Sequence, residues 1–265
     1  MTSLKITSIQ SEIADYSCKL ISGYLSEQMN IPIKFVDNLP WQNREEQFDR
    51  GEIHVCWMCS LPYIWKADRA SPGIELLAAP VMKPARYQDQ PVYFSDIVVQ
   101  RESKFRRFGD LRGASWAYNE PHSHSGYNIT RYRLAKMGIE NGYFGEVIVS
   151  GSHIRSLDLI LEGTVDASAI DSTVLDLLLT EKPGIGEQIR VIDTWGPSPI
   201  PPWVISKKLD ADLRKSMRKL LLEMHRHVEG RKILDQGLID HFTLVDDHYY
   251  DSVREMYRSA AAVSL

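Results

Sequence analysis

Small polar and imidazole side chains gather in one stretch of the chain, Pro121-His-Ser-His-Ser-Gly-Tyr127. Ser123 and Ser125 supply hydroxyl donors there, and Gly126 lets a ligand approach the backbone closely. A strand is expected before this stretch and a helix over residues 127–137 after it. Free N–H groups and the helix dipole favour an anion at such a helix N-terminus, even without a lysine. The stretch predicts an oxyanion cradle; ordinary helix capping by serine is the alternative interpretation.

A second loop, Val149-Ser-Gly-Ser-His-Ile154, repeats this arrangement of strand, small polar loop and helix. His153 is placed to donate a hydrogen bond to the same anion. Further along, Asp171 ends an expected strand and precedes Ser172. Three roles are open for Asp171: it faces a cationic part of the ligand, it orients His153, or it caps the next helix, which is the default.

The cysteines fit weaker patterns. Cys56-Trp-Met-Cys59 follows a strand, as a redox pair would, but the remaining order of a thioredoxin-like fold is absent. Cys56, Cys59, His122 and His124 are possible zinc ligands, yet the second C-x₂-C pair of a structural zinc site is missing. Three cysteines, an odd number, argue against a disulfide scaffold. We therefore expect no metal and no cofactor.

Composition limits the possible partners. The 265 residues carry a net charge of −4, with 43% hydrophobic and 25% charged residues, which is typical of a globular protein. The basic residues are spread along the chain, so no nucleic-acid partner is expected. We expect no membrane span and see no secretion signal at the start. The sequence leaves open a cytoplasmic protein, or a periplasmic or surface-tethered one from which an upstream signal has been removed.

The elements that must position these residues follow an α/β order. Strands are expected over 4–9, 31–36 and 53–58, with helices between them, which indicates a parallel sheet with helical crossovers. Strands over 74–79 and 92–99 come next. A second α/β unit then follows, with strands over 115–118, 146–149, 165–170 and 188–192, and helices over 127–137, 154–162 and 173–180. The chain closes with a proline-rich segment over 196–202, a strand over 203–205, and helices over 210–229 and 251–262.

This order predicts two lobes. Residues 1–99 plus 197–265 would form a discontinuous first lobe, and residues 100–196 an inserted second lobe. The hinge strands would lie near 92–99 and 197–205. Each lobe is expected to be a mostly parallel sheet flanked by helices, with the ligand in a cleft between the lobes at the strand carboxyl ends.

The succession of motifs resembles the phosphate/phosphite/phosphonate-binding proteins of ABC transporters. The motifs are Pro-His-Ser-His-Ser-Gly-Tyr, Ser-Gly-Ser-His, Gly-Thr-Val-Asp-Ala-Ser-Ala-Ile-Asp-Ser and Tyr250-Asp-Ser-Val-Arg-Glu-Met256, which together cover nearly the whole chain. The resemblance implies the two-lobed type II periplasmic-binding-protein-like fold. It also implies a small anionic ligand and an ABC-transporter permease as partners.

The resemblance carries over to individual residues. Ser123, His124 and Ser125 correspond to the family's Ser-Thr-Ser loop, which receives the oxyanion, and His153 to its ligand-contacting histidine. Tyr93 matches a cleft tyrosine. Ser60 belongs to a loop that would face the cleft, with Trp57 beside it. Together with Gly126 and Asp171, these are the expected ligand-binding residues.

Two departures from the family pattern limit the choice of ligand. His124 stands where the family usually has threonine, and the return crossing Ile200-Pro-Pro-Trp203 lacks the acid that aminoalkylphosphonate binders use there. The expected function is capture of a small phosphonate- or phosphate-like oxyanion by lobe closure, for ABC import. One alternative is a cytoplasmic enzyme on the same fold, with Glu120, His124, His153 and Asp171 as acid–base groups. The other is a ligand-sensing regulatory module.

Overall fold

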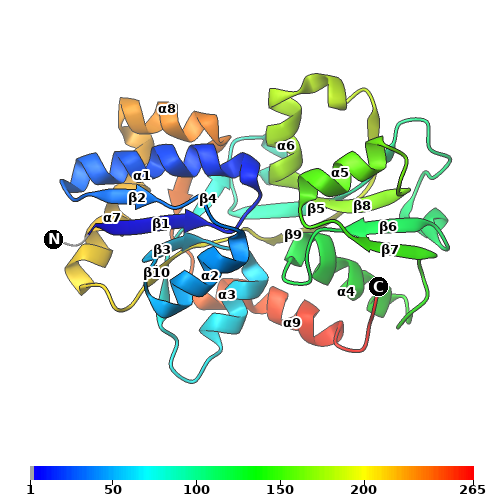
Figure 1. Cartoon of the computed structure of the whole chain (residues 1–265), viewed down its shortest axis with the longest axis horizontal. Helices are drawn as coiled ribbons and strands as arrows, with labels where there is room; N and C mark the ends of the chain where they lie inside the picture. The colour runs from blue at the N-terminus through cyan, green and yellow to red at the C-terminus, as the bar shows by residue number, and fades with distance from the viewer. Residues whose placement is uncertain (1–2) are drawn as a thin grey trace. The chain divides into compact units, whose positions relative to one another are not determined.

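The computed structural model describes residues 3–265 of the chain (Figure 1). The chain divides into two compact units. Unit 1 holds the residues up to Val92 together with Pro199–Tyr250, and unit 2 holds Tyr93–Ser198 together with Asp251–Leu265. The chain therefore passes between the units at three points, after Val92, Ser198 and Tyr250.

Unit 1 contains a six-stranded sheet with the order β11-β4-β10-β3-β1-β2. Its strands are β1 (Leu4–Ser8), β2 (Ile33–Phe35), β3 (Val55–Trp57), β4 (Ile74–Met82), β10 (Trp203–Ser206) and β11 (Ile239–Thr243). β1 pairs in parallel with β2 and β3, which confirms the expected first crossovers. β10 runs antiparallel to β3 and β4, and β11 antiparallel to β4.

Five α-helices flank this sheet, namely α1 (Asp15–Met29), α2 (Trp41–Arg50), α3 (Ser60–Ala67), α7 (Ala211–Glu223) and α8 (Val228–Gln236). α1 packs against both α7 and α8. Figure 1 shows α1 and α8 on one side of the sheet and α2 and α3 on the other. The helices thus bury both faces of the sheet.

Unit 2 contains a five-stranded sheet with the order β7-β6-β8-β5-β9. Its strands are β5 (Val92–Gln100), β6 (Ser115–Tyr118), β7 (Glu146–Val149), β8 (Ala167–Asp171) and β9 (Ile189–Pro199). β6 is parallel to β7 and β8, whereas β5 is antiparallel to β8. Both sheets are therefore mixed. The expected α/β class is confirmed, but the sheets are not mostly parallel as the sequence predicted. The reason is that β5 and β10 enter their sheets directly after a passage between units, without the helical crossover that enforces parallel pairing.

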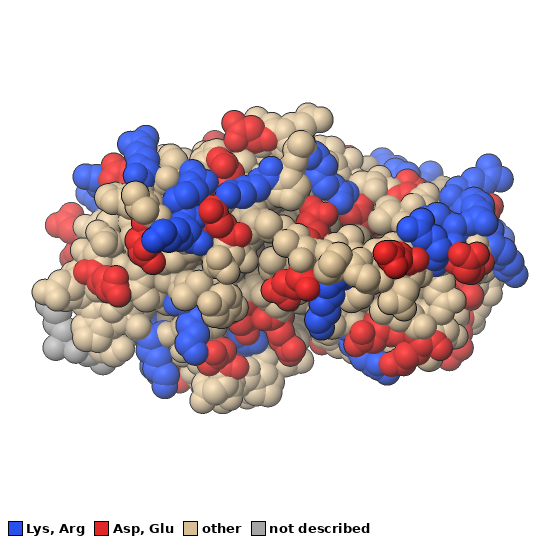
Figure 2. Space-filling model, turned by 90° about the horizontal axis from the view of Figure 1, so that it is seen from above, with Lys and Arg blue, Asp and Glu red and all other residues tan. Residues whose placement is uncertain are grey.

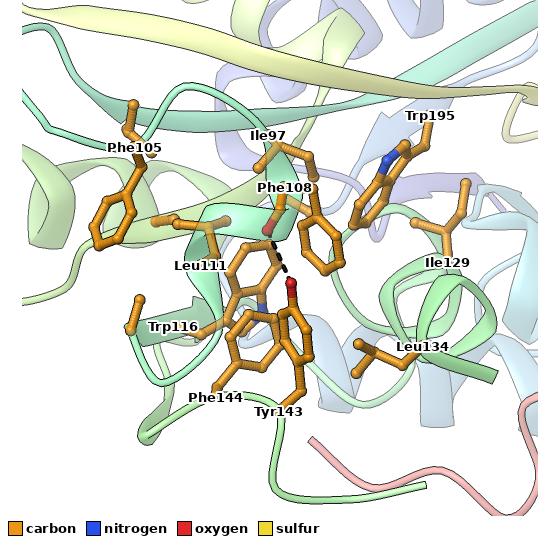
Figure 3. Packing of buried hydrophobic residues seen from close by; sticks show 14 of the residues in the cluster. Ile97, Phe105, Phe108, Leu111, Trp116, Ile129, Leu134, Tyr143, Phe144 and Trp195 are labelled. Atoms are coloured by element: carbon orange, nitrogen blue, oxygen red, sulfur yellow. Dashed lines mark hydrogen bonds between the residues drawn. The ribbon is translucent and has the colours of Figure 1, made fainter. Parts of the chain in front are cut away.

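The helices of unit 2 are α4 (Ile129–Lys136), α5 (His153–Leu161), α6 (Ser172–Glu181) and α9 (Asp251–Ser259). In Figure 1, α5 and α6 lie on one side of the sheet and α4 on the other. An aromatic core fills the α4 side (Figure 3). The ring of Phe108 stacks on Tyr143 with 5.1 Å between centroids, and its edge meets Trp195 at 4.7 Å. This core holds β6 and the start of α4 in place, and these two elements flank the predicted cradle.

The C-terminal segment belongs to unit 2, although the sequence placed residues 197–265 together in the first lobe. α9 packs against α4, and the Arg131 guanidinium donates to the carbonyl oxygens of Val263 and Ala260, both at 2.7 Å. β5, also expected in the first lobe, pairs with β8. Both assignments depend on contacts between residues far apart in the sequence, which local patterns do not encode.

The sequence missed β11 and expected one helix over 210–229 where the structure has α7, a short 3-10 turn (Met224–Arg226) and α8. Gly230 shows why the chain can turn there. A Cβ atom at Gly230 would lie 2.1 Å from the carbonyl oxygen of Met224, so only glycine allows α8 to approach the end of α7 this closely.

Charged side chains are mixed over most of the face shown in Figure 2. Basic side chains gather at the right of that view, on unit 2, where residues 101–112 include five Lys or Arg. Within residues 3–265, no helix has both the length and the apolar character needed to cross a membrane.

Candidate functional site

The predicted cradle begins with a wide helical turn at the end of β6. Residues His124–Asn128 form a π-helix that leads directly into α4. Ser123 is its N-cap, and the Ser123 Oγ accepts a hydrogen bond from the Gly126 N–H at 3.0 Å. The capping interpretation is therefore correct for Ser123, but the bond uses only a lone pair and leaves the hydroxyl hydrogen for a ligand. π-turns of this kind are frequent at functional sites.

Gly126 is required by the close packing inside this turn. A Cβ atom there would lie 2.0 Å from the Asn119 Oδ1 and 3.2 Å from the His153 Cε1. The first distance is far below any real Cβ contact, so even alanine would displace Asn119. The sequence explained this glycine by ligand approach, and the structure adds a packing reason.

The two predicted loops meet at Ser125 and His153. The Ser125 Oγ lies 3.1 Å from the His153 Nε2, and both side chains are buried. His153 is the first residue of α5, whose N-cap Ser152 accepts from the Arg155 N–H at 3.0 Å. Burial lowers the pKa of His153 to about 4, with the Ala169 backbone opposing the shift. At neutral pH the cradle thus holds a neutral imidazole beside two helix N-termini.

His124 points into the interior of unit 2. Its Nδ1 lies 3.0 Å from the Asn128 Nδ2, and its Nε2 lies 3.1 Å from the Ser198 Oγ. The ring of Tyr93 is 6.3 Å away between centroids. Burial lowers the pKa of His124 to about 4, so this ring is also neutral at pH 7. The cradle therefore has no charged side chain among Ser123, His124, Ser125 and His153.

Asp171 is a helix cap. Its Oδ1 accepts from the Thr173 N–H at 2.8 Å and from the Thr173 hydroxyl at 2.7 Å, at the start of α6. Burial raises the pKa of Asp171 to about 6, although the Thr173 hydrogen bonds oppose this shift. The default role given to Asp171 is confirmed, and nothing links its carboxylate to His153.

Trp57 and Ser60 lie in unit 1 and hold the returning chain there. The Trp57 Nε1 donates to the Pro201 carbonyl at 2.9 Å, and the Ser60 hydroxyl donates to the Pro199 carbonyl at 3.0 Å. Trp57 also stacks on Trp203, with 6.1 Å between ring centroids. Both residues thus have structural partners, and contact of either with a ligand stays a prediction.

The cysteines and possible metal ligands do not form a reactive centre with the cradle. Burial raises the pKa of the Cys56 thiol far above its usual range, which opposes the thiolate that redox chemistry needs. Among residues 3–265, one group of three potential metal ligands converges, namely Asp89, Asp240 and His241, on the surface of unit 1. None of these three belongs to the zinc set considered from the sequence.

Known proteins match this chain along most of its length. The sequence model of a family described as ABC transporter, phosphonate, periplasmic substrate-binding protein matches residues 17–250. The chain belongs to this family. Phosphonate-family proteins serve transport as substrate-binding proteins and not as enzymes, which agrees with the resemblance identified from the motifs.

Individual relatives of the phosphonate family are distant in sequence and close in fold. A probable ABC transporter phosphite binding protein, PhnD1 of Prochlorococcus marinus (strain MIT 9301), is 19% identical over 260 residues, covering 93% of this chain and 85% of the relative. The structure of PhnD1 with methylphosphonate superposes with a TM-score of 0.85 over 98% of this chain and 99% of that one. A binding protein component of an ABC phosphonate transporter from Pseudomonas aeruginosa gives 0.85 at 17% identity, covering 98% and 86%. These neighbours confirm the two-lobed binding-protein fold.

The sequence did not predict the two hydrogen-bond partners of His124, which are Asn128 and Ser198. Asn128 follows His124 by four positions, the spacing at which helical side chains meet, so this signal was available. Ser198 lies 74 positions from His124, inside the proline-rich segment expected to be a crossing. Nothing local distinguishes Ser198 from a turn residue, and only the folded chain brings it to the histidine.

Proposed function

We propose that this protein captures a small phosphonate- or phosphate-like oxyanion at the unit 2 cradle, formed by Ser123, Ser125, Gly126 and His153, and presents it to an ABC importer. The observation that carries the proposal is the pairing of the Ser125 hydroxyl with His153 at the N-terminus of α5. This pairing joins two helix starts into one uncharged group, in which one of the two side chains donates to the other. Tyr93, buried beside His124, is the proposed aromatic neighbour of the anion.

Neutral donors suit a ligand that must later be released. Each hydrogen bond to a charged group contributes about 1.5–3 kcal/mol. Three or four such bonds are enough for micromolar affinity, which corresponds to about −8 kcal/mol. Helix N-termini add favourable dipole energy without a lysine or arginine. Membership of a periplasmic binding-protein family supports a periplasmic location and a permease as partner. Methylphosphonate, present in the PhnD1 structure, is the first ligand to test.

Isothermal titration of the purified protein with methylphosphonate, phosphite, phosphate, aminoethylphosphonate and sulfate tests this proposal. We expect micromolar or tighter binding of at least one phosphorus oxyanion and weaker binding of aminoethylphosphonate, because Ile200-Pro-Pro-Trp203 lacks an acid for the amine. Absence of binding to all three non-amino phosphorus compounds would remove the proposed function. Preference for sulfate would keep the anion site but change the ligand class.

A further inference from the structure

His124 is held at both ring nitrogens. The ring is fully buried, its Nδ1 is 3.0 Å from the Asn128 Nδ2, and its Nε2 is 3.1 Å from the Ser198 Oγ. Asn128 is fully buried as well, and Ser198 is 2% exposed. The three side chains thus form a chain of hydrogen bonds that is shielded from solvent.

The donors and acceptors available on these side chains determine the direction of the two hydrogen bonds that join Asn128, His124 and Ser198. The amide nitrogen of Asn128 is a donor only, so the His124 Nδ1 must accept and carries no hydrogen. A neutral imidazole has one N–H, which then resides on Nε2 and is donated to the Ser198 Oγ. The opposite amide orientation would leave the buried Asn128 NH₂ without an acceptor, a costlier state than the unpaired Asn128 Oδ1 of the present one.

These hydrogen bonds leave the hydroxyl hydrogen of Ser198 unused. Ser198 accepts from His124, so its own hydroxyl hydrogen is available for donation. Among residues 3–265 the structure gives the Ser198 hydroxyl no side-chain partner besides His124. A buried hydroxyl with an unused hydrogen gains from an acceptor, and leaving that hydrogen unpaired is destabilising. His124 lies between the two cradle serines in the sequence, so one hydrogen bond ties Ser198 to the segment that carries them.

We propose that Ser198 is a further ligand-binding donor of the anion site. His124 and Asn128 are positioning residues, because their hydrogen bonds make Ser198 an acceptor toward His124 and leave its hydroxyl hydrogen for the ligand. This inference rests on the proposed function. Its chemistry favours a ligand with a deprotonated oxygen at that position. His124 itself does not contact the anion, because its only N–H is given to Ser198.

The tautomer of His124 can be measured without any ligand. Long-range ¹H–¹⁵N NMR of the full chain distinguishes the two neutral forms of imidazole, and a His124→Gln spectrum identifies the signal. We expect the Nε2–H form at pH 7.5. The Nδ1–H form would overturn the inference, because Ser198 would then donate to His124 and have no hydrogen for a ligand.

Binding of methylphosphonate tests the role of Ser198. Ser198→Ala should weaken the affinity by about 10-fold to 100-fold, the range expected when a donor to a charged group is removed. An affinity within twofold of the wild type would overturn the inference while leaving the proposed function intact. A wild type that binds none of the phosphorus oxyanions would overturn both.

A double-mutant cycle on ligand affinity with Asn128 and Ser198 distinguishes a positioning role of Asn128 from general structural damage. Asn128→Leu removes the donor that fixes the tautomer, so it should weaken binding in the wild type and have little further effect in Ser198→Ala. Additive losses in the double variant would contradict the relay through His124. Thermal unfolding of each variant confirms that the compared proteins are folded, and Ser216→Ala, on the exposed face of α7, is the control for loss of a serine.

Discussion

Ser125 is the residue on which the anion cradle depends most directly. Its hydroxyl lies within hydrogen-bond distance of His153 and at the start of the helix that follows, so it is placed to serve both a ligand and the imidazole. Ser125→Ala should weaken methylphosphonate binding by about 1.5–3 kcal/mol, roughly 10-fold to 100-fold. Titration calorimetry measures this, with Ser216→Ala as the matched control. An unchanged affinity would place the anion elsewhere.

Gly126 is the residue whose replacement should disrupt the cradle without removing a donor. An added Cβ meets the Asn119 Oδ1 at 2.0 Å, so Gly126→Ala should destabilise the protein by about 1–3 kcal/mol and weaken ligand binding. Gly23→Ala is the control, because Gly23 is at an exposed position of α1, a Cβ there meets nothing within 4 Å, and alanine in a helix is more stable than glycine by about 0.5–1 kcal/mol. Chemical unfolding of both variants compares them. Equal stability of the two would show that the turn adapts to a side chain.

At the scale of elements, the Arg131 side chain of α4 binds the segment that follows the C-terminal helix. Arg131 donates to the carbonyl oxygens of Val263 and Ala260, which follow α9 in the chain. Arg131→Met keeps the aliphatic stem but removes these bonds, so residues 251–265 should lose hydrogen-exchange protection and stability should fall by about 1–3 kcal/mol. Lys136→Met, at an exposed position of the same helix, is the control. Equal protection of this segment in both variants would contradict the assignment.

At the scale of the whole molecule, buried ionisable groups predict opposing effects of acid. The pKa of His124 and that of His153 fall from 6.5 to about 4 on folding. Above pH 6.5 both histidines are neutral in the folded and the unfolded chain. As the pH falls from 6.5 toward 4, stability is lost, because the two histidines bind protons in the unfolded chain and stay neutral in the folded chain. Asp15 and Asp171 act in the other direction. Their pKa values rise from 3.8 to about 6 on folding, so stability is gained as the pH falls through that window.

The histidine contribution can be isolated with a variant. His124→Asn removes one depressed pKa, so the stability of the wild type relative to this variant should decrease by about 2 kcal/mol between pH 7.5 and pH 5.0. Urea unfolding at the two pH values measures the difference, and His122→Asn, at an exposed position of the same loop, controls for loss of a histidine. A relative stability independent of pH would show that His124 titrates alike in the folded and unfolded chains.

The order of helices and strands was predictable, because each element follows from the pattern of residues that are close together in the sequence. The strand expected over 146–149 is β7 without change, and the expected helix over 173–180 lies within α6. Glycine and serine mark the loops between them, since caps and turns require those residues locally. The antiparallel directions of β5 and β10 and the membership of the C-terminal segment were not predictable, because they depend on partners far apart in the sequence, such as β8 for β5 and Val263 for Arg131.

The candidate site likewise combines features that the sequence predicts with features that depend on contacts between distant residues. The sequence by itself determined the α/β class, the family, the two serine–histidine loops and the default capping role of Asp171, because each follows from the order of residues along the chain. The closing of the two lobes over a ligand stays a prediction. Only the tertiary structure decided that Ser125 meets His153 and that the His124 Nε2 lies beside the Ser198 hydroxyl. Those contacts join side chains 28 and 74 positions apart, and the burial that comes with them keeps both imidazoles neutral at pH 7.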